Sequence, residues 1–400
     1  MEYIPKLDDI IEAYDDSEGN LTCGVELEFL IASVESRDPD PHPELSQRVY
    51  KPTEYLPPDY KRDILEQVLE TLQQQLEEIP FRLTDDDDFH PPHDNVPIYD
   101  AWRLGLDVTV RKTEGVPIGP YTWVNCELSS VVMGPNEYAK QIQDVCRVLA
   151  TLRVHLNEST SVHVHVGRGD EPFSLLTLKK FATLQWLTER VLLELHHPSR
   201  LNNKYCYRLN KCSQLATKSQ AALSAEERNL DEKGVDQMDK FVPMGLTKLR
   251  HSQIRHIWGC KTIQEVALLM QGDREKIPSS RAMFERGAVG FQRFLPAGKS
   301  GGNLQTFEWR QMSGSIDAKH INQWVKTCLA FTDFCRLSNP ATFKKLIEKV
   351  IQKGKSYTGF ELLRDLGLET QLFKEKVERY SEDQGFFEGD KEGNLFVSPT

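Results

Sequence analysis

The strongest constraint on the fold is one pattern that occurs in three separate segments of the chain. GVELEF (residues 24–29), SVHVHVG (161–167) and TFEWRQ (306–311) each alternate apolar residues with charged or titratable ones. Side chains two residues apart project from the same face of a β-strand, about 6.6–6.8 Å apart along it. Each segment is therefore predicted to be a strand with one apolar face and one face of titratable side chains.

The titratable faces are unusual in their residue types, because none of them carries Thr, Lys or Gln between the apolar positions. In chain order they carry the pairs Glu26 and Glu28, His163 and His165, and Glu308 and Arg310. A solvent-exposed strand face would explain any one pair taken alone. If the three strands share one sheet, these oxygen and nitrogen ligands suit Mg²⁺ or Mn²⁺, and the arginine suits phosphate. Adjacent carboxylates also repel each other unless a cation offsets their charge.

A fourth segment adds a carboxylate to this pattern. WVNCELSSVVMGP (residues 123–135) places Glu127 among apolar neighbours, just before a Ser-Ser pair and a Gly-Pro turn. The preceding segment GLDVTV (105–110) offers Asp107 in a similar setting. Each carboxylate is either an exposed polar position or a further metal ligand, and the local pattern leaves both interpretations open.

Composition and charge narrow the class of protein. The 400 residues carry a net charge of −11, with a pI near 5.6 and no basic cluster, which argues against a nucleic-acid surface. No apolar stretch reaches the roughly 18 residues that a membrane span needs, and the first 20 residues lack a signal-peptide pattern. The eight cysteines are scattered without CxxC pairs. We expect a cytoplasmic protein with reduced cysteines and no membrane or nucleic-acid partner.

Periodicity along the chain predicts the remaining elements. Residues 198–240 are polar and mixed and are expected to form a loop with one short charged helix, and residues 35–60 a long irregular loop. Strands separated by helices and long loops predict an α+β fold around a mainly antiparallel sheet. Helical patterns cover residues 61–79, 136–157, 175–196, 262–271, 317–338 and much of the segment after 340.

Four motifs together carry a resemblance to a known family. In chain order they are GVELEF, CELSSVVMGP, SVHVHVG and TFEWRQMSGSID. This set resembles the amidoligase family that is widespread in fungi, within the superfamily that includes glutamine synthetase and glutamate–cysteine ligase. The resemblance implies a glutamine synthetase-like catalytic domain, with a curved sheet, helices on its outer face, and ATP and Mg²⁺ or Mn²⁺ on its concave face. The resemblance covers about residues 21–340, which include a polar insertion at about 198–250. Outside this range we expect an acidic lead-in at residues 1–20 and a helical charged tail at 341–400.

The resemblance also implies metal ligands. Glu28 and Glu127 would bind a first metal ion, and Glu26, His163 and Glu308 would bind a second.

Other residues would contact the nucleotide or substrate. The resemblance implies that His165 contacts the ATP phosphates and that Arg310 meets the transferred phosphate or the substrate carboxylate. Arg293, in GFQRFLP, stands where the family tends to have a polar or basic residue facing the site. Lys299, in the glycine-rich PAGKSGG, either caps phosphates or lies in a hairpin turn. Residues 210–245 match no part of the family pattern and leave the substrate pocket undefined.

Two further segments are ambiguous. The acidic run at residues 85–94 either binds a cation or forms a solvated loop. Arg200, Asn203 and Tyr205 either contact substrate or nucleotide, or belong to a surface loop that follows a helix.

The combined expectation is an ATP- and Mg²⁺-dependent amidoligase that joins a carboxylate to an amine through an acyl phosphate. Its substrates would be small molecules or peptides. The alternatives are a phosphotransferase on the same fold, a non-catalytic ATP- or metal-binding relative, and a mononuclear His-x-His oxygenase or hydrolase. The sequence identifies neither the two substrates, nor the general base, nor the oligomeric state.

Overall fold

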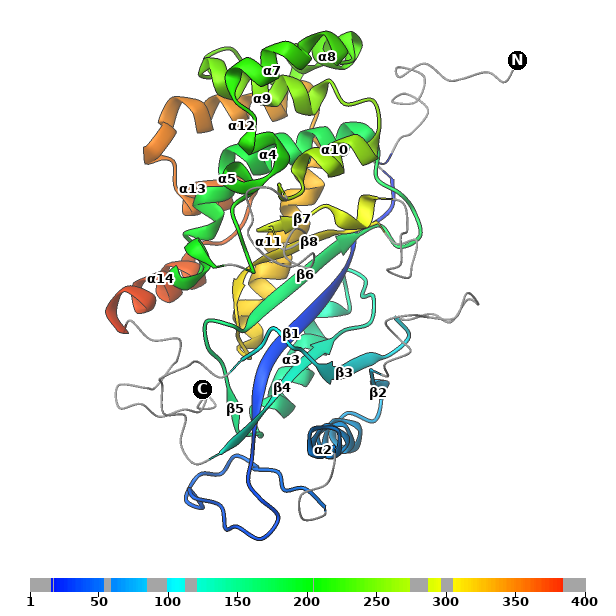
Figure 1. Cartoon of the computed structure of the whole chain (residues 1–400), viewed down its shortest axis with the longest axis vertical. Helices are drawn as coiled ribbons and strands as arrows, with labels where there is room; N and C mark the ends of the chain where they lie inside the picture. The colour runs from blue at the N-terminus through cyan, green and yellow to red at the C-terminus, as the bar shows by residue number, and fades with distance from the viewer. Residues whose placement is uncertain are drawn as a thin grey trace, which may run out of the picture.

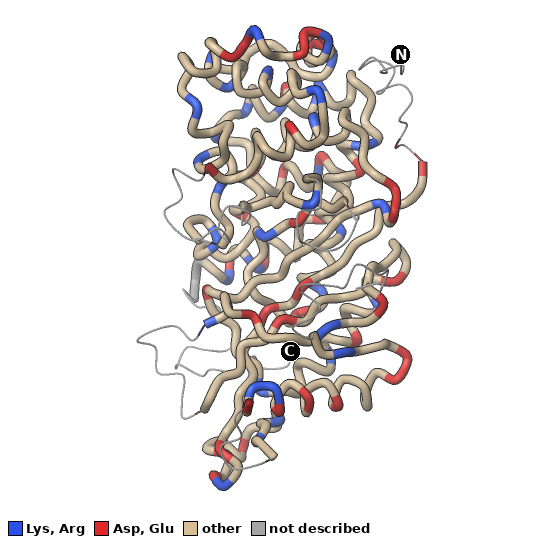
Figure 2. The backbone as a smooth tube through the Cα atoms, turned by 45° about the vertical axis from the view of Figure 1, so that its right-hand side comes forward, with Lys and Arg blue, Asp and Glu red and all other residues tan. Residues whose placement is uncertain are grey.

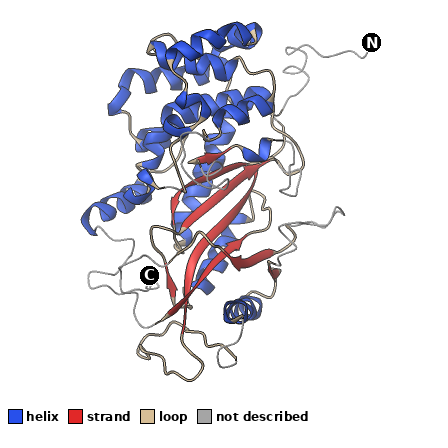
Figure 3. Ribbon diagram, in the orientation of Figure 1, coloured by secondary structure: helices blue, strands red, loops and turns tan. Residues whose placement is uncertain are grey.

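The computed structural model describes residues 16, 18–53, 59–84, 99–111, 121–203, 205–273, 287–295 and 305–383. A twisted sheet runs through the lower half of the view in Figure 1, and most helices gather above it in a separate layer. Figure 3 shows other helices lying behind the strands, against one face of the sheet. This arrangement leaves the opposite face of the sheet to the loops.

One sheet contains all the strands of the described residues. Their spatial order is β2-β3-β4-β1-β6-β8-β7, and β5 pairs with β1 outside this path. Only β2 and β3 pair in parallel, so the predicted mainly antiparallel sheet is confirmed. The strands are β1 (Thr22–Ser33), β2 (Phe81–Leu83), β3 (Trp102–Leu106), β4 (Thr122–Ser129), β5 (Val154–His155), β6 (Ser161–Gly167), β7 (Val289–Gly290) and β8 (Phe307–Ser313).

The apolar face of the sheet packs against helices α3 (Tyr138–Leu149), α4 (Leu175–Leu193) and α11 (Ala318–Leu337). The ring of Phe181 on α4 stacks on Phe307 of β8 with centroids 3.7 Å apart. Trp309 of β8 meets Phe331 of α11 edge-on at 5.0 Å. The apolar positions predicted from the alternating pattern are all at most 1% exposed: Val25, Leu27, Phe29, Val162, Val164, Val166, Phe307 and Trp309.

Residues 198–241 form several short helices, so the predicted loop with one helix is wrong. Serines at 213 and 219 and an aspartate at 231 accept hydrogen bonds from the first turns of α6, α7 and α8. Helices α5, α6 and α7 each bury one apolar side chain, too few for a visible helical period, whereas α8 buries three. The elements are η2 (Pro198–Asn202), α5 (Leu209–Cys212), α6 (Gln214–Thr217), α7 (Gln220–Glu226), η3 (Glu227–Asn229) and α8 (Glu232–Phe241).

Other helices follow the predicted pattern more closely. Helix α2 (Tyr60–Gln75) is confirmed, whereas α3 and α4 end earlier than expected, and α9 (Lys248–Trp258) was not predicted. The helical segment after residue 340 packs on the protein, because α12 contacts α4 and α8 and buries Phe343 and Ile347. The remaining helices are α10 (Ile263–Met270), η5 (Gln292–Phe294), α12 (Pro340–Lys353), η6 (Gly354–Ser356), α13 (Gly359–Asp365) and α14 (Gln371–Asp383).

Two further expectations concern the cysteines and the membrane. All eight cysteines are free thiols, and all except Cys212 are buried. None of the described helices combines the length and apolar character needed to cross a bilayer.

Two buried histidines lie where α4, α11 and α14 meet. His196 is 3% exposed and packs edge-on against Trp324 at 4.3 Å, and His320 is 2% exposed. Within the described chain, neither nitrogen of His196 has a hydrogen-bond partner. Burial lowers the pKa of His196 well below its usual range, and the nearby charge of His320 adds to this. Burial and the charge of Lys376 lower the pKa of His320 to about 3, against the opposing effect of Asp317.

We predict that the free energy of unfolding decreases as the pH falls below about 6.5. The unfolded chain protonates both imidazoles near their ordinary pKa, whereas the folded chain keeps them neutral, so protons favour unfolding. Each histidine contributes up to about 1.4 kcal/mol per pH unit in this window. Urea unfolding between about pH 5 and about pH 7 should show a shallower decrease for His320→Asn than for the wild type. His251→Asn, on the partly exposed surface of α9, is the control, and an unchanged slope in His320→Asn would contradict the prediction.

Candidate active site

The strand register brings the predicted site residues together on the face of the sheet opposite the helices. Three cross-strand pairs define this face: Glu28 with Glu127, Glu26 with His163, and His165 with Glu308. Directly opposed residues on antiparallel strands have Cβ atoms about 4.5–5.5 Å apart. We call this the polar face. It is not a solvated strand face, because Glu28, His163 and Glu308 are at most 7% exposed.

Glu28, Asp107 and Glu127 form the first carboxylate group, the Glu28 set, with ligand atoms within 4.8 Å of one another. The Ser161 hydroxyl donates to Glu28 Oε2 at 2.6 Å, and the Ser129 hydroxyl donates to Glu127 Oε1 at 3.1 Å. Asp107 follows the end of β3, where its carboxylate accepts a hydrogen bond from the backbone of Thr109 at 2.6 Å. These hydroxyl and amide donors orient the carboxylates but bring no positive charge.

The pKa values of the Glu28 set reflect this shortage of positive charge. Burial raises the pKa of Glu127 well above its usual range, and the neighbouring carboxylates Glu26, Glu28 and Asp107 raise it further. Burial also raises the pKa of Glu28, which the charge of His163 offsets only in part. Three carboxylates whose negative charge is offset only in part fit a hard divalent cation.

Glu26, His165 and Glu308 form the second group, the Glu26 set, also within 4.8 Å of one another. His165 Nε2 lies 3.0 Å from Glu26 Oε1 and 3.9 Å from Glu308 Oε1. Burial raises the pKa of Glu26, but His165 and His163 outweigh it, so the pKa lies well below its usual range. A mixed set of carboxylate and imidazole donors suits Mn²⁺ as well as Mg²⁺.

His163 lies between the two sets. Its Nδ1 is 2.8 Å from Glu26 Oε2 and 3.8 Å from Glu308 Oε1, and its Nε2 is 2.8 Å from the Ser161 hydroxyl. The same Nε2 is 3.4 Å from Glu28 Oε1. The resemblance assigned His163 to the metal of Glu26 and Glu308, whereas the structure groups His165 with these two carboxylates.

Arg310 reaches the polar face at an irregularity in the pairing of β6 with β8, which lies between Val162 and Val164. Such bulges change the direction of a side chain next to functional sites. The Arg310 guanidinium pairs with Glu308, and its Nη1 lies 3.4 Å from His163 Nε2. Burial raises the pKa of Glu308, but Arg310 outweighs this effect and the pKa falls below its ordinary value.

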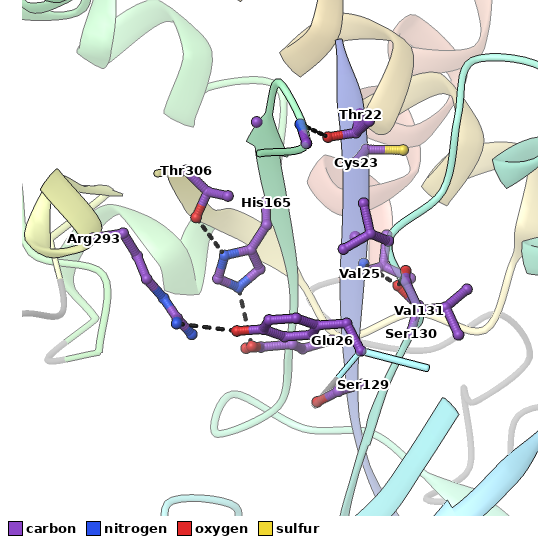
Figure 4. A pocket seen from close by; sticks show the side chains of 15 residues that line it. Thr22, Cys23, Val25, Glu26, Ser129, Ser130, Val131, His165, Arg293 and Thr306 are labelled. Atoms are coloured by element: carbon purple, nitrogen blue, oxygen red, sulfur yellow. Dashed lines mark hydrogen bonds and ion pairs between the residues drawn. The ribbon is translucent and has the colours of Figure 1, made fainter. Parts of the chain in front are cut away.

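Arg293 reaches the same face from η5. Its Nη1 donates to the Tyr99 hydroxyl at 3.1 Å. Tyr99, Glu26 and His165 line the same pocket as Arg293, and Figure 4 shows Arg293, Glu26 and His165 around it. This pocket is partly open to solvent. Gly24 and Gly167 also line it, so the polar face carries no side chains there.

The remaining residues that the sequence suggested as candidates do not belong to either ligand set. Lys299 and the acidic run at residues 85–94 lie outside the described residues. Asn203 donates to the carbonyl of Glu158 at 2.9 Å and accepts from the backbone of Tyr205, so Asn203 ties the loop to the protein. Arg200 is fully buried and donates to the carbonyl of Arg310 at 2.6 Å.

Two residues of the site were missed in the sequence. Ser161 occupies the same face of β6 as His163 and His165, so the period of two could have revealed it. Tyr99 precedes β3 and reaches Arg293 through the fold, and no local pattern indicates that contact.

Outside the site, acidic and basic residues are not separated into distinct regions of the surface. Figure 2 shows acidic and basic positions interspersed over the helical layer, while several acidic positions lie close together along the sheet. This distribution agrees with the net charge of −11. Local charge concentration is therefore a property of the polar face rather than of the helical layer.

Comparison with known proteins identifies the family. A family model described as "Putative amidoligase enzyme" matches residues 19–241, just over half of the chain. No curated protein matches the chain significantly. The matched region includes β1, β4 and β6, and therefore most of the polar face, whereas β8 lies beyond it. On the strength of this match, the chain belongs to the amidoligase enzyme family.

Proposed function

We propose that the protein is an ATP- and Mg²⁺-dependent amidoligase that joins a carboxylate to an amine through an acyl phosphate. The observation that carries the proposal is the presence of two adjacent ligand sets on one buried sheet face, with an arginine paired to one of them. Family membership supports the ligase class. Small molecules or peptides are the proposed substrates.

The donor atoms fit two divalent cations. We propose that the Glu28 set holds one ion and the Glu26 set the other, with His165 as the imidazole ligand. His163 would then orient carboxylates of both sets, whereas the resemblance implies that His163 is the metal ligand and His165 contacts the ATP phosphates. When bound, such ions neutralise phosphate charge and act as Lewis acids.

The chain's own residues would position and stabilise the reacting groups. A substrate carboxylate oxygen attacks the γ-phosphorus of ATP and ADP leaves; an amine then attacks the acyl carbon, phosphate leaves and the amine loses a proton. Phosphoryl transfer asks the protein mainly for positioning and charge stabilisation. Arg310 and Arg293 would donate to phosphoryl oxygens, for which the guanidinium fork is well suited.

We also propose that one glutamine synthetase-like domain extends over about residues 21–340. The supporting observation is that β8, which carries Glu308 and Arg310, pairs with β6 in the same sheet as the matched strands. Free cysteines throughout are compatible with the reducing cytoplasm that we propose as its location.

We predict that the wild type binds two Mn²⁺ ions per chain and that each ligand set can be disabled separately. Glu28→Gln should abolish one site and Glu308→Gln the other, because an amide lacks the carboxylate charge that each set needs. Titration followed by the electron paramagnetic resonance of free Mn²⁺ measures the number of sites. Glu66→Gln, on the exposed side of α2, is the matched control and should keep both.

Thermal melts of the same proteins establish that the variants fold. Two undiminished sites in both Glu28→Gln and Glu308→Gln would refute the assignment.

We predict that ADP release requires both a carboxylic acid and an amine. A panel of acids and amines, with ADP measured and products identified by mass, tests this. With an ¹⁸O-labelled carboxylate, one label should appear in the released phosphate, because the acyl phosphate transfers that oxygen. Arg310→Gln should lower kcat by about 10²- to 10³-fold, whereas Arg147→Gln, on the exposed side of α3, should not.

The phosphotransferase alternative gives a different result. ADP release at the same rate without any amine, together with an accumulating phosphorylated product, would overturn the ligase assignment in favour of a kinase.

A further inference from the structure

The contact between Tyr99 and Arg293 joins two segments from opposite sides of the sheet. Tyr99 precedes β3, and Arg293 follows β7, while β4, β1, β6 and β8 lie between these strands. Five strand spacings in a flat sheet amount to about 24 Å, which is more than the two side chains span. The two segments must therefore fold inward over the polar face, where both side chains line the pocket with Glu26 and His165 (Figure 4).

Described contacts lie next to both residues. Arg293 lies between Phe291 and Phe294, which are 2% and 1% exposed and pack on Phe307 of β8. Tyr99 is followed by Asp100, which pairs with an arginine of β2 and an arginine of β3.

Arg293 differs from Arg310 in what it binds. Arg310 pairs directly with Glu308, whereas no carboxylate of the described chain lies within 4.0 Å of the Arg293 guanidinium. Burial lowers the pKa of Arg293, but Tyr99, Glu308 and Glu26 outweigh it, and Glu26 lines the same pocket as Arg293. A guanidinium binds a carboxylate more strongly than it binds a neutral phenol. The tyrosine contact thus holds Arg293 away from a stronger partner.

We propose that Tyr99 is a positioning residue that keeps Arg293 off Glu26 and so leaves this carboxylate available to a divalent cation. The inference rests on the proposed function. The phenol is a weak enough acceptor to give up Arg293 when a phosphate group enters the pocket, since hydrogen bonds to phosphate are charge-assisted. Without the phenol hydroxyl, the guanidinium turns onto Glu26 and competes with the cation.

The test is Mn²⁺ binding to four proteins without ATP: the wild type, Tyr99→Phe, Arg293→Gln and the double variant. Tyr99→Phe should weaken one of the two Mn²⁺ sites by about tenfold, as expected if one charge-assisted hydrogen bond now competes. The double variant should return to the wild-type affinity, because the competing guanidinium is gone. Tyr138→Phe, on α3 at the other face of the sheet, is the matched control and should bind like the wild type.

The outcomes separate this inference from the function on which it rests. If the wild type binds two Mn²⁺ ions and Tyr99→Phe binds them equally well, the positioning role is overturned and the proposed metal sites stand. If Tyr99→Phe weakens binding but the double variant does not restore it, the loss is structural and the role is again overturned. A wild type that binds no Mn²⁺ overturns the metal sites and this inference together.

Discussion

Repulsion between buried carboxylates is the constraint on which the rest of the polar face depends. At the β8 end it is offset within the chain, because imidazoles lie beside Glu26 and a guanidinium pairs with Glu308. At the β4 end Glu28 and Glu127 receive only hydroxyl hydrogen bonds. The pKa values diverge accordingly, downward for the first two carboxylates and upward for the other two. The negative charge that the chain itself leaves uncompensated is therefore greatest at the β4 end of the polar face.

The opposite face of the same strands makes this concentration of charge sustainable. A buried carboxylate cluster destabilises the fold, and the aromatic packing of β8 on α4 and α11 supplies the opposing apolar burial. Arg200 adds a polar support, because it donates to the carbonyl of Arg310 at the irregular position of β8. On β1, β6 and β8, the apolar side chains of one face stabilise the fold, and the titratable side chains of the other face form the candidate site.

The alternation of apolar and titratable residues predicted the strands, because it indicates both which side chains are buried against the helices and which lie on the polar face. It could not predict which strands are neighbours, since the pairing of Glu26 with His163 depends on contacts between distant segments. Asp107 stayed ambiguous because it lies just past the end of β3, where alternation no longer applies. Tyr99 gave no signal, and α5, α6 and α7 were missed because each buries one apolar side chain, too few to show a period.

The position of β8 in the chain has a consequence for how the protein is made. β6 acquires its second neighbour only from residues 307–313, so during synthesis its edge stays unpaired until the ribosome has passed that segment. Unpaired strand edges template aggregation, and such long-range pairing is slow to form. Nascent chains that stop near residue 241 would include most of the family match yet lack an intact sheet. Catalytic competence and protection from misfolding would thus be acquired in the same late step of translation.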